Sequence, residues 1–264
     1  GPTYIPGANI SITGTTIDTK AFPCNSNLLD NWYFGNPVNQ RGASGTISTA
    51  GYFFDRWKLV SGSVTINSGG IVLNGTIAQV LEYAVGQTVT ATVLTPDGVT
   101  DVTPVYDDET KTFTVTTQGK TIRAVKLELG SVQTLAHQDA NGAWVLNEIP
   151  DYGEQLRRCQ RYFVRIGDST VGYTGTIGIS NCANATGSNT FIPTPVTLRA
   201  TPAITLHNIY LRKGTTDHEV TSVNSFSLSA NGIFCALNSS DLPAGETLLV
   251  RAINGGYMDL SADL

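Results

Sequence analysis

The sequence has little charge, one methionine and no long apolar run. Only 14% of its 264 residues are charged, and 16 Lys and Arg against 21 Asp and Glu give a formal net charge of -5. Because such a chain has no basic excess to attract a phosphate backbone, we expect no nucleic-acid partner. No apolar segment approaches the roughly 20 residues that span a bilayer, so we expect no membrane insertion.

Signal motifs and metal-ligand motifs are also missing. The first residues contain no basic stretch followed by an apolar one, so no secretion signal is expected, and Gly1-Pro2 resembles the remnant of a removed tag. The four cysteines match no C-x-x-C pattern, which argues against a zinc site, leaves free thiols as the default and leaves one disulfide open. These cysteines are Cys24, Cys159, Cys182 and Cys235.

Recognisable catalytic motifs are absent as well. The sequence contains no G-x-S-x-G, P-loop, H-E-x-x-H or G-x-G-x-x-G pattern. His137, His207 and His218 lie far apart, and each is interpreted as a surface or strand histidine. The acidic residues 107–109 lie between two expected strands and are interpreted as a hairpin turn, not as a glycosidase or calcium site. We therefore expect no catalysis, no metal and no cofactor.

What the sequence does contain is the composition of strands and tight turns. Thr, Val, Ile, Ser and Asn recur throughout beside 27 glycines, which is typical of an all-β protein. Within residues 27–137, seven or eight short alternating segments are separated by turn residues, which favours a jelly-roll β-sandwich. One strand is expected over residues 52–60. The tryptophans expected in the core are Trp32, Trp57 and Trp144.

Shorter or smaller units are expected on either side of this sandwich. In residues 1–26, isoleucines alternate with small polar residues and predict a strand pair whose apolar face is buried by copies of itself. These isoleucines are Ile10, Ile12 and Ile17. Residues 164–264 predict a second, smaller β-sandwich with a long strand over 195–213. Its polar loops are expected at residues 181–189, 213–219 and 254–259.

Residues 138–163 predict a linker that ends in one short helix. Asp151 follows Pro150 as the expected N-cap, and Glu154 three residues later completes the capping pattern. The apolar stripe of this helix is expected to be Leu156, Cys159 and Phe163. Its basic run is Arg157, Arg158 and Arg161. We interpret this run as a solvated helix face and not as a phosphate site.

Four motifs occur in a fixed order along the chain. They are NLLDNW with a following QRG turn, DRW, KLELG, and CQRYF, between residues 27 and 163. In this order they resemble a recurring module of bacteriophage and prophage tail-fibre proteins, in which a carbohydrate-binding-module-like jelly roll is followed by a short helix and a distal head. The segment YIPGANISITGTTID also resembles the repeat that ends fibre shafts.

The resemblance implies a homotrimeric component of the virion tail that acts outside the host cell and adheres to a bacterial surface glycan or surface protein. In such fibres the distal head meets the host, so the loops of residues 164–264 are the expected receptor site. The candidate ligand-binding residues are Tyr173, Asn184, Asn189, Tyr210, His218 and Tyr257.

Two other functions remain open at this point. The first is a fibre tip that cleaves surface polysaccharide with a pair of carboxylates. Its candidate acids are Asp217, Glu219, Asp241 and Glu246. The second is a purely structural fibre connector. The motif residues themselves are expected to serve architecture, and Arg41, Asp55 and Arg56 are expected to pair with one another beneath the sheet.

Overall fold

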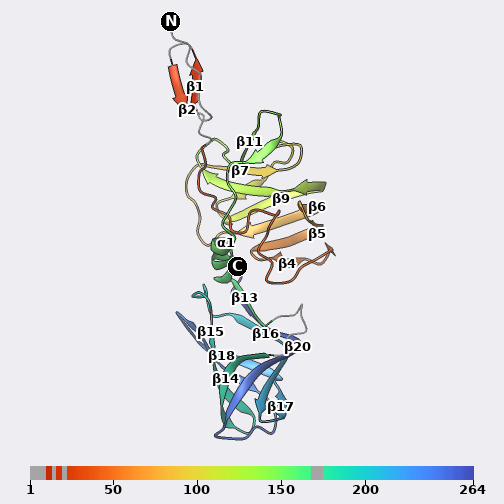
Figure 1. Ribbon diagram of the computed structural model, residues 1–264, viewed down its shortest axis with the longest axis vertical. Helices are drawn as coiled ribbons and strands as arrows, with labels where there is room; N and C mark the ends of the chain where they lie inside the picture. Colours follow the sequence, from red (N-terminus) through yellow and green to blue (C-terminus); the bar gives the residue numbers. More distant parts are fainter. Residues whose placement is uncertain (1–9, 14–15, 20–22, 168–174) are drawn as a thin grey trace.

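The computed structural model describes residues 10–13, 16–19, 23–167 and 175–264. The predicted all-β class is confirmed, because the described residues form strands and one short helix. Figure 1 shows an elongated molecule with a hairpin at one end, a first β-unit in the middle and a second β-unit at the other end. The helix and the C-terminus lie between the two units. None of the described helical segments is long and apolar enough to span a membrane.

The N-terminal strand pair is confirmed. Strands β1 (Ile10–Thr13) and β2 (Thr16–Thr19) are antiparallel, and Ile12 lies opposite Ile17 in the register.

The first β-unit is a two-layer sandwich. One layer is a six-stranded sheet in the order β3-β5-β6-β9-β8, with β4 paired to β5. The other layer is the pair β7 and β10, and residues 28–34 run beside β10. The strands are β3 (Thr46–Ile47), β4 (Gly51–Phe54), β5 (Trp57–Asn67), β6 (Gly70–Val80), β7 (Val89–Leu94), β8 (Val105–Asp107), β9 (Thr112–Ile122) and β10 (Ala124–Leu129).

A single hydrophobic cluster fills the space between these layers. It includes Trp57 and Phe113 from the large sheet and Val125 from the smaller one. Trp32 and Trp57 are buried, as predicted, and Trp144 packs against the cluster while half-buried. The cluster extends to the short hairpin of β11 (Ala136–Gln138) and β12 (Trp144–Leu146).

The prediction of one strand over residues 52–60 is wrong. Strand β4 ends at Phe54 and β5 begins at Trp57, because Asp55 and Arg56 form a turn in which Arg56 has a φ of 70°. The expected pairing among Arg41, Asp55 and Arg56 is also wrong. Each side chain finds a different partner: Arg56 pairs with Asp30, Arg41 pairs with Asp263, and Asp55 accepts hydrogen bonds from Gln40.

The predicted helix is confirmed as α1 (Tyr152–Gln160). The Asp151 side chain is the N-cap and accepts a hydrogen bond from the Glu154 backbone N–H at 2.7 Å. Of the expected stripe, Cys159 is buried and Leu156 is half-buried, whereas Phe163 lies beyond the helix in the next strand.

The second β-unit is one eight-stranded sheet in the order β17-β16-β20-β14-β15-β19-β18, with β13 also paired to β20. The sheet curls so that β16 contacts β18, and the buried side chains form a second hydrophobic cluster inside the curl. The strands are β13 (Phe163–Gly167), β14 (Gly175–Asn184), β15 (Gly187–Pro193), β16 (Ala203–Lys213), β17 (Thr216–Glu219), β18 (Ser222–Ser229), β19 (Gly232–Asn238) and β20 (Thr247–Ser261).

Three elements in this unit differ from the sequence prediction. Most of the loop expected at residues 181–189 lies in β14 and β15, and only residues 185–186 form a turn. The strand expected from residue 195 begins only at Ala203, because residues 194–202 cross from the preceding strand without pairing in the sheet. The loop expected at residues 254–259 lies inside β20. Asn254 and Gly255 have positive φ values there and form an irregularity opposite Asn208, so the polar residues bulge without ending the strand.

The two units are joined by direct contacts. Arg41 forms an ion pair with Asp263 at 2.5 Å and lies 3.8 Å over the Phe163 ring. The Tyr52 hydroxyl donates to the Leu264 carbonyl oxygen at 2.6 Å, and the Arg199 N–H donates to the Arg161 carbonyl oxygen at 2.8 Å. The chain end therefore returns to the first unit, and Arg199 of the second unit contacts the C-cap of α1.

Candidate functional site

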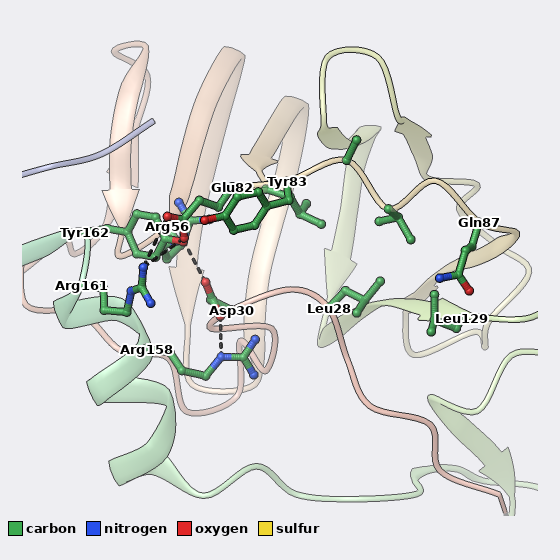
Figure 2. Close-up of a pocket in the computed structure, with 13 residues that line it drawn as sticks. Leu28, Asp30, Arg56, Glu82, Tyr83, Gln87, Leu129, Arg158, Arg161 and Tyr162 are labelled. Atoms are coloured by element: carbon green, nitrogen blue, oxygen red, sulfur yellow. Dashed lines mark hydrogen bonds and ion pairs between the residues drawn. The ribbon is translucent and has the colours of Figure 1, made fainter. Parts of the chain in front are cut away.

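A surface cavity of about 470 Å³ lies between α1, residues 28–30 and the loop that follows β6. We call it the Tyr83 pocket (Figure 2). Cavities that bind small molecules have volumes of about 300–1,000 Å³, so its size suits one or two sugar rings. Its lining residues are Leu28, Asp30, Arg56, Leu81, Glu82, Tyr83, Ala84, Val85, Gln87, Leu129, Arg158, Arg161 and Tyr162.

The upper wall of the pocket is the loop 81–87, and hydrogen bonds from a neighbouring turn fix it. The Leu81 N–H donates to the Lys111 carbonyl oxygen at 2.8 Å. The Asp108 carboxylate accepts from the N–H groups of Val85 at 2.5 Å and Gly86 at 3.1 Å. Gly86 has a φ of 64°, a conformation that glycine adopts at little cost.

The acidic residues 107–109 form the expected turn. The Asp107 carboxylate accepts from the Glu109 N–H at 3.0 Å and from the Thr110 hydroxyl at 2.9 Å. Hydrogen bonds from the Tyr106 hydroxyl and from the loop N–H groups lower the pKa of Asp108 below its usual value. This turn therefore positions the wall of the Tyr83 pocket.

At the end of the pocket near α1, Asp30 lies between two guanidinium groups. Arg56 Nε is 3.0 Å from one carboxylate oxygen and Arg158 Nε is 2.6 Å from the other. Gln79 fixes the Asp30 backbone by accepting from its N–H and donating to its carbonyl oxygen, each at 2.8 Å. Arg56 also stacks 3.6 Å over the Tyr162 ring.

A second carboxylate at this end is held in the same way. Glu82 accepts from Arg161 Nη2 at 3.2 Å and from the Tyr162 hydroxyl at 3.1 Å. Burial raises the pKa of Tyr162 to about 12, so its hydroxyl remains a donor at physiological pH. Both pocket carboxylates are thus engaged by guanidinium groups, an arrangement that favours binding over proton transfer.

The opposite end of the pocket is mainly apolar. Figure 2 places Leu28, Leu129 and Gln87 there, away from the arginines. The Tyr83 side chain is 76% exposed, and Leu129 is also exposed. An exposed aromatic ring beside fixed polar groups suits a sugar, because the ring covers the apolar face of a pyranose while amides, guanidinium groups and carboxylates bind its hydroxyls.

The structure does not bring the six predicted ligand residues together. Asn184 is the last residue of β14, and His218 lies in β17, which is at the end of the second unit that faces away from the first (Figure 1). Asn189 is exposed on β15 and Tyr210 is half-buried on β16. Tyr173 lies outside the described residues.

Tyr257 lies toward the first unit. Its ring stacks on His207 with centroids 4.6 Å apart, and the Arg165 guanidinium lies 3.8 Å from the centroid of the Tyr257 ring. Arg165 in turn pairs with Asp259 at 2.7 Å and donates to the Arg41 carbonyl oxygen at 3.0 Å. This cluster supports the connection between the two units.

The four acids considered for polysaccharide cleavage also lie outside the Tyr83 pocket. Asp217 pairs with Arg212 and lies 3.9 Å from Arg251, and the Arg212 hydrogen bond lowers the pKa of Asp217. A general acid in glycoside hydrolysis needs a raised pKa, so Asp217 is unsuited to that role. Glu246 pairs with Lys213, and Glu219 and Asp241 are exposed.

Cysteine and metal chemistry are not evident in the described part of the chain. All four cysteines are free thiols, and only Cys24 is exposed. No group of three or more His, Cys, Asp or Glu side chains is arranged to hold a metal ion among residues 10–13, 16–19, 23–167 and 175–264.

Sequence reasoning missed the residue that defines the pocket. Tyr83 directly follows residues 76–82, TIAQVLE, one of the alternating segments, and lies three residues before Gly86. An aromatic residue therefore occurs between two strands, where it does not contribute to the core. That position was the available signal. The arginines of α1 were recognised, but their position beside a cavity depends on how the helix packs against residues 28–30 and 81–87.

No known family model, curated protein or solved structure matches this chain. The likeness to tail-fibre modules therefore depends on the four sequence motifs. In the structure, the amides of the first motif have structural roles: Asn27 Nδ2 donates to the Val125 carbonyl oxygen at 2.8 Å, and Asn31 Nδ2 donates to the Val38 and Asp55 carbonyl oxygens.

Proposed function

We propose that this chain is the receptor-binding end of a bacteriophage tail fibre, which adheres without catalysis to a bacterial surface glycan through the Tyr83 pocket. The observation that carries the proposal is the open cavity in which Tyr83 is 76% exposed beside fixed polar groups. The ordered sequence motifs and the all-β fold support the tail-fibre assignment.

The geometry of the pocket favours recognition of a sugar within a longer polymer. The cavity is open to solvent along one side and has an apolar end and a charged end (Figure 2). Such shallow sites bind single sugars weakly, and fibres offset this by presenting several copies. Linked sites raise overall avidity by about 10² to 10⁴ without any new contact.

The test is a binding assay of fluorescently labelled protein on bacterial cells and purified wall glycans, with three variants beside the natural sequence. Tyr83→Ala is expected to reduce binding about tenfold or more, because it removes the exposed ring. Tyr152→Ala is the matched control, since Tyr152 is also an exposed tyrosine but does not line the pocket. A double variant, Asn184→Ala with His218→Ala, examines the far end of the second unit.

The outcomes separate the candidate sites. Binding that is lost in Tyr83→Ala and kept in the other variants supports the pocket. Binding that is lost only in the Asn184 and His218 variant moves the receptor site to the second unit. If the protein binds no cell or glycan, the connector function becomes the better explanation.

We also propose that the chain forms a homotrimer. Four exposed apolar side chains lie in one row across neighbouring strands of the second unit, where Leu249 is opposite Ile179 and Phe191 is opposite Phe234. The order β20-β14-β15-β19 brings these pairs side by side. Exposed apolar rows of this kind commonly mark contacts between protein chains.

A further inference from the structure

A second cavity, of about 570 Å³, lies on the other side of the α1 arginines. We call it the helix groove. One wall is a single face of α1 and its C-cap, with residues spaced three and four apart, and the other wall is the segment 196–199. The helix residues are Glu154, Arg157, Arg158 and Arg161.

The segment 196–199 is fixed against the helix. The Arg199 N–H donates to the Arg161 carbonyl oxygen at 2.8 Å, and Leu198 is buried. The Thr197 hydroxyl donates to the Ala230 carbonyl oxygen at 2.8 Å. Arg199 Nε and Nη2 donate to the carbonyl oxygens of Ala262 and Asp263. The groove is therefore already formed in the free protein.

Positive charge exceeds negative charge in this part of the molecule. Five guanidinium groups and three carboxylates line the Tyr83 pocket and the helix groove together, although the whole chain has a net charge of -5. Asp30 and Glu82 neutralise Arg158 and Arg161 on the side of the Tyr83 pocket. Arg157 is exposed and has no ion-pair partner within the described residues.

A structural role accounts for only part of this charge. Cations near a helix C-terminus are stabilised by the helix dipole. That effect explains basic residues at the end of α1, and the bonds of Arg199 to the Ala262 and Asp263 carbonyl oxygens explain its orientation, but neither pairs Arg157 with an acid among the described residues. Arg157, with paired N–H donors, and the Nη1 group of Arg199 line one groove from two segments, and such donors match a carboxylate or phosphate.

The helix groove and the Tyr83 pocket share two residues. Arg158 and Arg161 line both cavities, so the two sites lie on either side of the same side chains. A polymer that places a sugar ring on Tyr83 has its neighbouring units within reach of the helix groove. Figure 2 places the shared arginines at the charged end of the Tyr83 pocket, so this end adjoins the groove.

We propose that the helix groove binds the oxyanion of an acidic polysaccharide whose sugar ring occupies the Tyr83 pocket. This inference depends on the proposed glycan-binding function and names its ligand class: a polymer that carries a phosphate or a carboxylate on its repeating units. Arg157 binds the oxyanion with its paired N–H donors, and Arg199, whose Nε and Nη2 hold the C-terminal carbonyl oxygens, contributes its Nη1 group. Arg158 and Arg161 are held by Asp30 and Glu82 and line both sites.

The experiment measures binding of the full chain to three immobilised polymers: a polyglycerol phosphate, a polygalacturonate and neutral dextran. Arg157→Gln removes an exposed charge and is not expected to affect folding. It is expected to weaken binding to the preferred acidic polymer about threefold to tenfold. Arg157→Lys keeps the charge but loses the paired donors, and is expected to give an intermediate loss. Arg123→Gln is the matched control, because Arg123 is exposed and lies outside both cavities.

Supporting results are a preference for one acidic polymer over dextran, a loss of that preference in Arg157→Gln, and a decrease in binding as salt is raised. The comparison of the two acidic polymers shows whether the helix groove prefers a phosphate or a carboxylate. Equal binding to acidic and neutral polymers that is abolished by Tyr83→Ala overturns the anionic site but leaves the glycan-binding function intact. No binding of any glycan, on cells or in purified form, overturns the function itself.

Discussion

Asn31 illustrates how one amide side chain determines a turn and connects three parts of the first unit. Its φ is 52°, in the left-handed region that Asn tolerates better than most residues. Its side chain donates to the Val38 and Asp55 carbonyl oxygens and accepts from the Val38 N–H. Its backbone carbonyl accepts from the Trp57 indole N–H at 2.8 Å. The sequence motif could indicate that Asn31 matters for architecture, but not which groups it binds.

Asp55 is a buried carboxyl group whose protonation differs between the folded and unfolded states. Burial raises its pKa from the usual 3.8 to about 6, outweighing the hydrogen bonds from Gln40 and the attraction of Arg41. Between these two pH values the folded protein binds more protons than the unfolded chain. The contribution of Asp55 to the free energy of unfolding is therefore fully present below about pH 4 and is lost as the pH rises through about 6.

We predict that Asp55→Asn removes this pH dependence. As the pH rises from about 4 to about 7.5, the free energy of unfolding of the variant is expected to increase by roughly 2–3 kcal/mol relative to that of the natural sequence. Denaturant unfolding of both proteins at the two pH values measures the change. If the substitution also alters the Gln40 contacts, the resulting change in stability is the same at both pH values and does not affect this comparison. A difference that stays the same at both pH values would contradict the prediction.

At the scale of elements, two glycines lie inside long strands, although glycine in a sequence usually indicates a turn. Gly62 and Gly75 interrupt the alternating pattern and look like turn residues, yet they lie directly opposite each other within β5 and β6. A Cβ on Gly62 would lie 2.0 Å from the Asn74 carbonyl oxygen, so the two backbones approach closely there. A sequence pattern can indicate that glycine interrupts a strand, but not that two glycines meet across a sheet.

The helix, by contrast, could be predicted almost completely. Its capping signal is local, because Asp151 and the Glu154 N–H lie within one turn. The Tyr83 pocket could not be predicted in this way. Its walls come from residues 28–30, 81–87 and 158–162, and only the packing of the two sheets and α1 brings these segments together.

The turn at Asp108 provides a prediction at this scale. Asp108→Ala removes the acceptor for the Val85 and Gly86 N–H groups, so the wall of the Tyr83 pocket is expected to loosen. We expect faster hydrogen exchange at these two amides and glycan binding reduced several-fold. Since Asp108 is exposed, we expect a loss of less than about 1 kcal/mol in global stability.

The control is Asp107→Ala. It breaks the neighbouring hydrogen bonds to Glu109 and Thr110 but leaves those to the loop intact. If both variants weaken binding equally, the turn as a whole matters and the specific support by Asp108 is refuted. Amide exchange followed by mass spectrometry, together with the glycan-binding assay, distinguishes these cases.

At the scale of the molecule, direct contacts fix the two units against each other, so residues of both can form one receptor surface. Arg41 and Tyr52 contact the returning C-terminal residues, and Arg199 from the second unit lines the helix groove beside α1. The proposed anionic site therefore combines α1, whose arginines pair with Asp30 and Glu82 of the first unit, with Arg199 of the second unit. Its residues come from two separate segments, 154–161 and 196–199, and only tertiary packing brings these together, which is why no local pattern could indicate it.

The exposed apolar row of the second unit gives the prediction for assembly. Ile179 is 61% exposed and lies beside Leu249, and Phe191 and Phe234 continue the row. If this row is the trimer contact, Ile179→Asp places a charge in an apolar interface and is expected to produce monomers, because an unpaired buried charge is costly. Sedimentation at several protein concentrations measures the mass of the species in solution.

Val60→Asp, at an exposed apolar site on β5 of the first unit, is the control and is expected to leave the trimer intact. A natural chain that remains monomeric at every concentration would refute the trimer for the residues present, and a trimer that survives Ile179→Asp would move the contact away from this row.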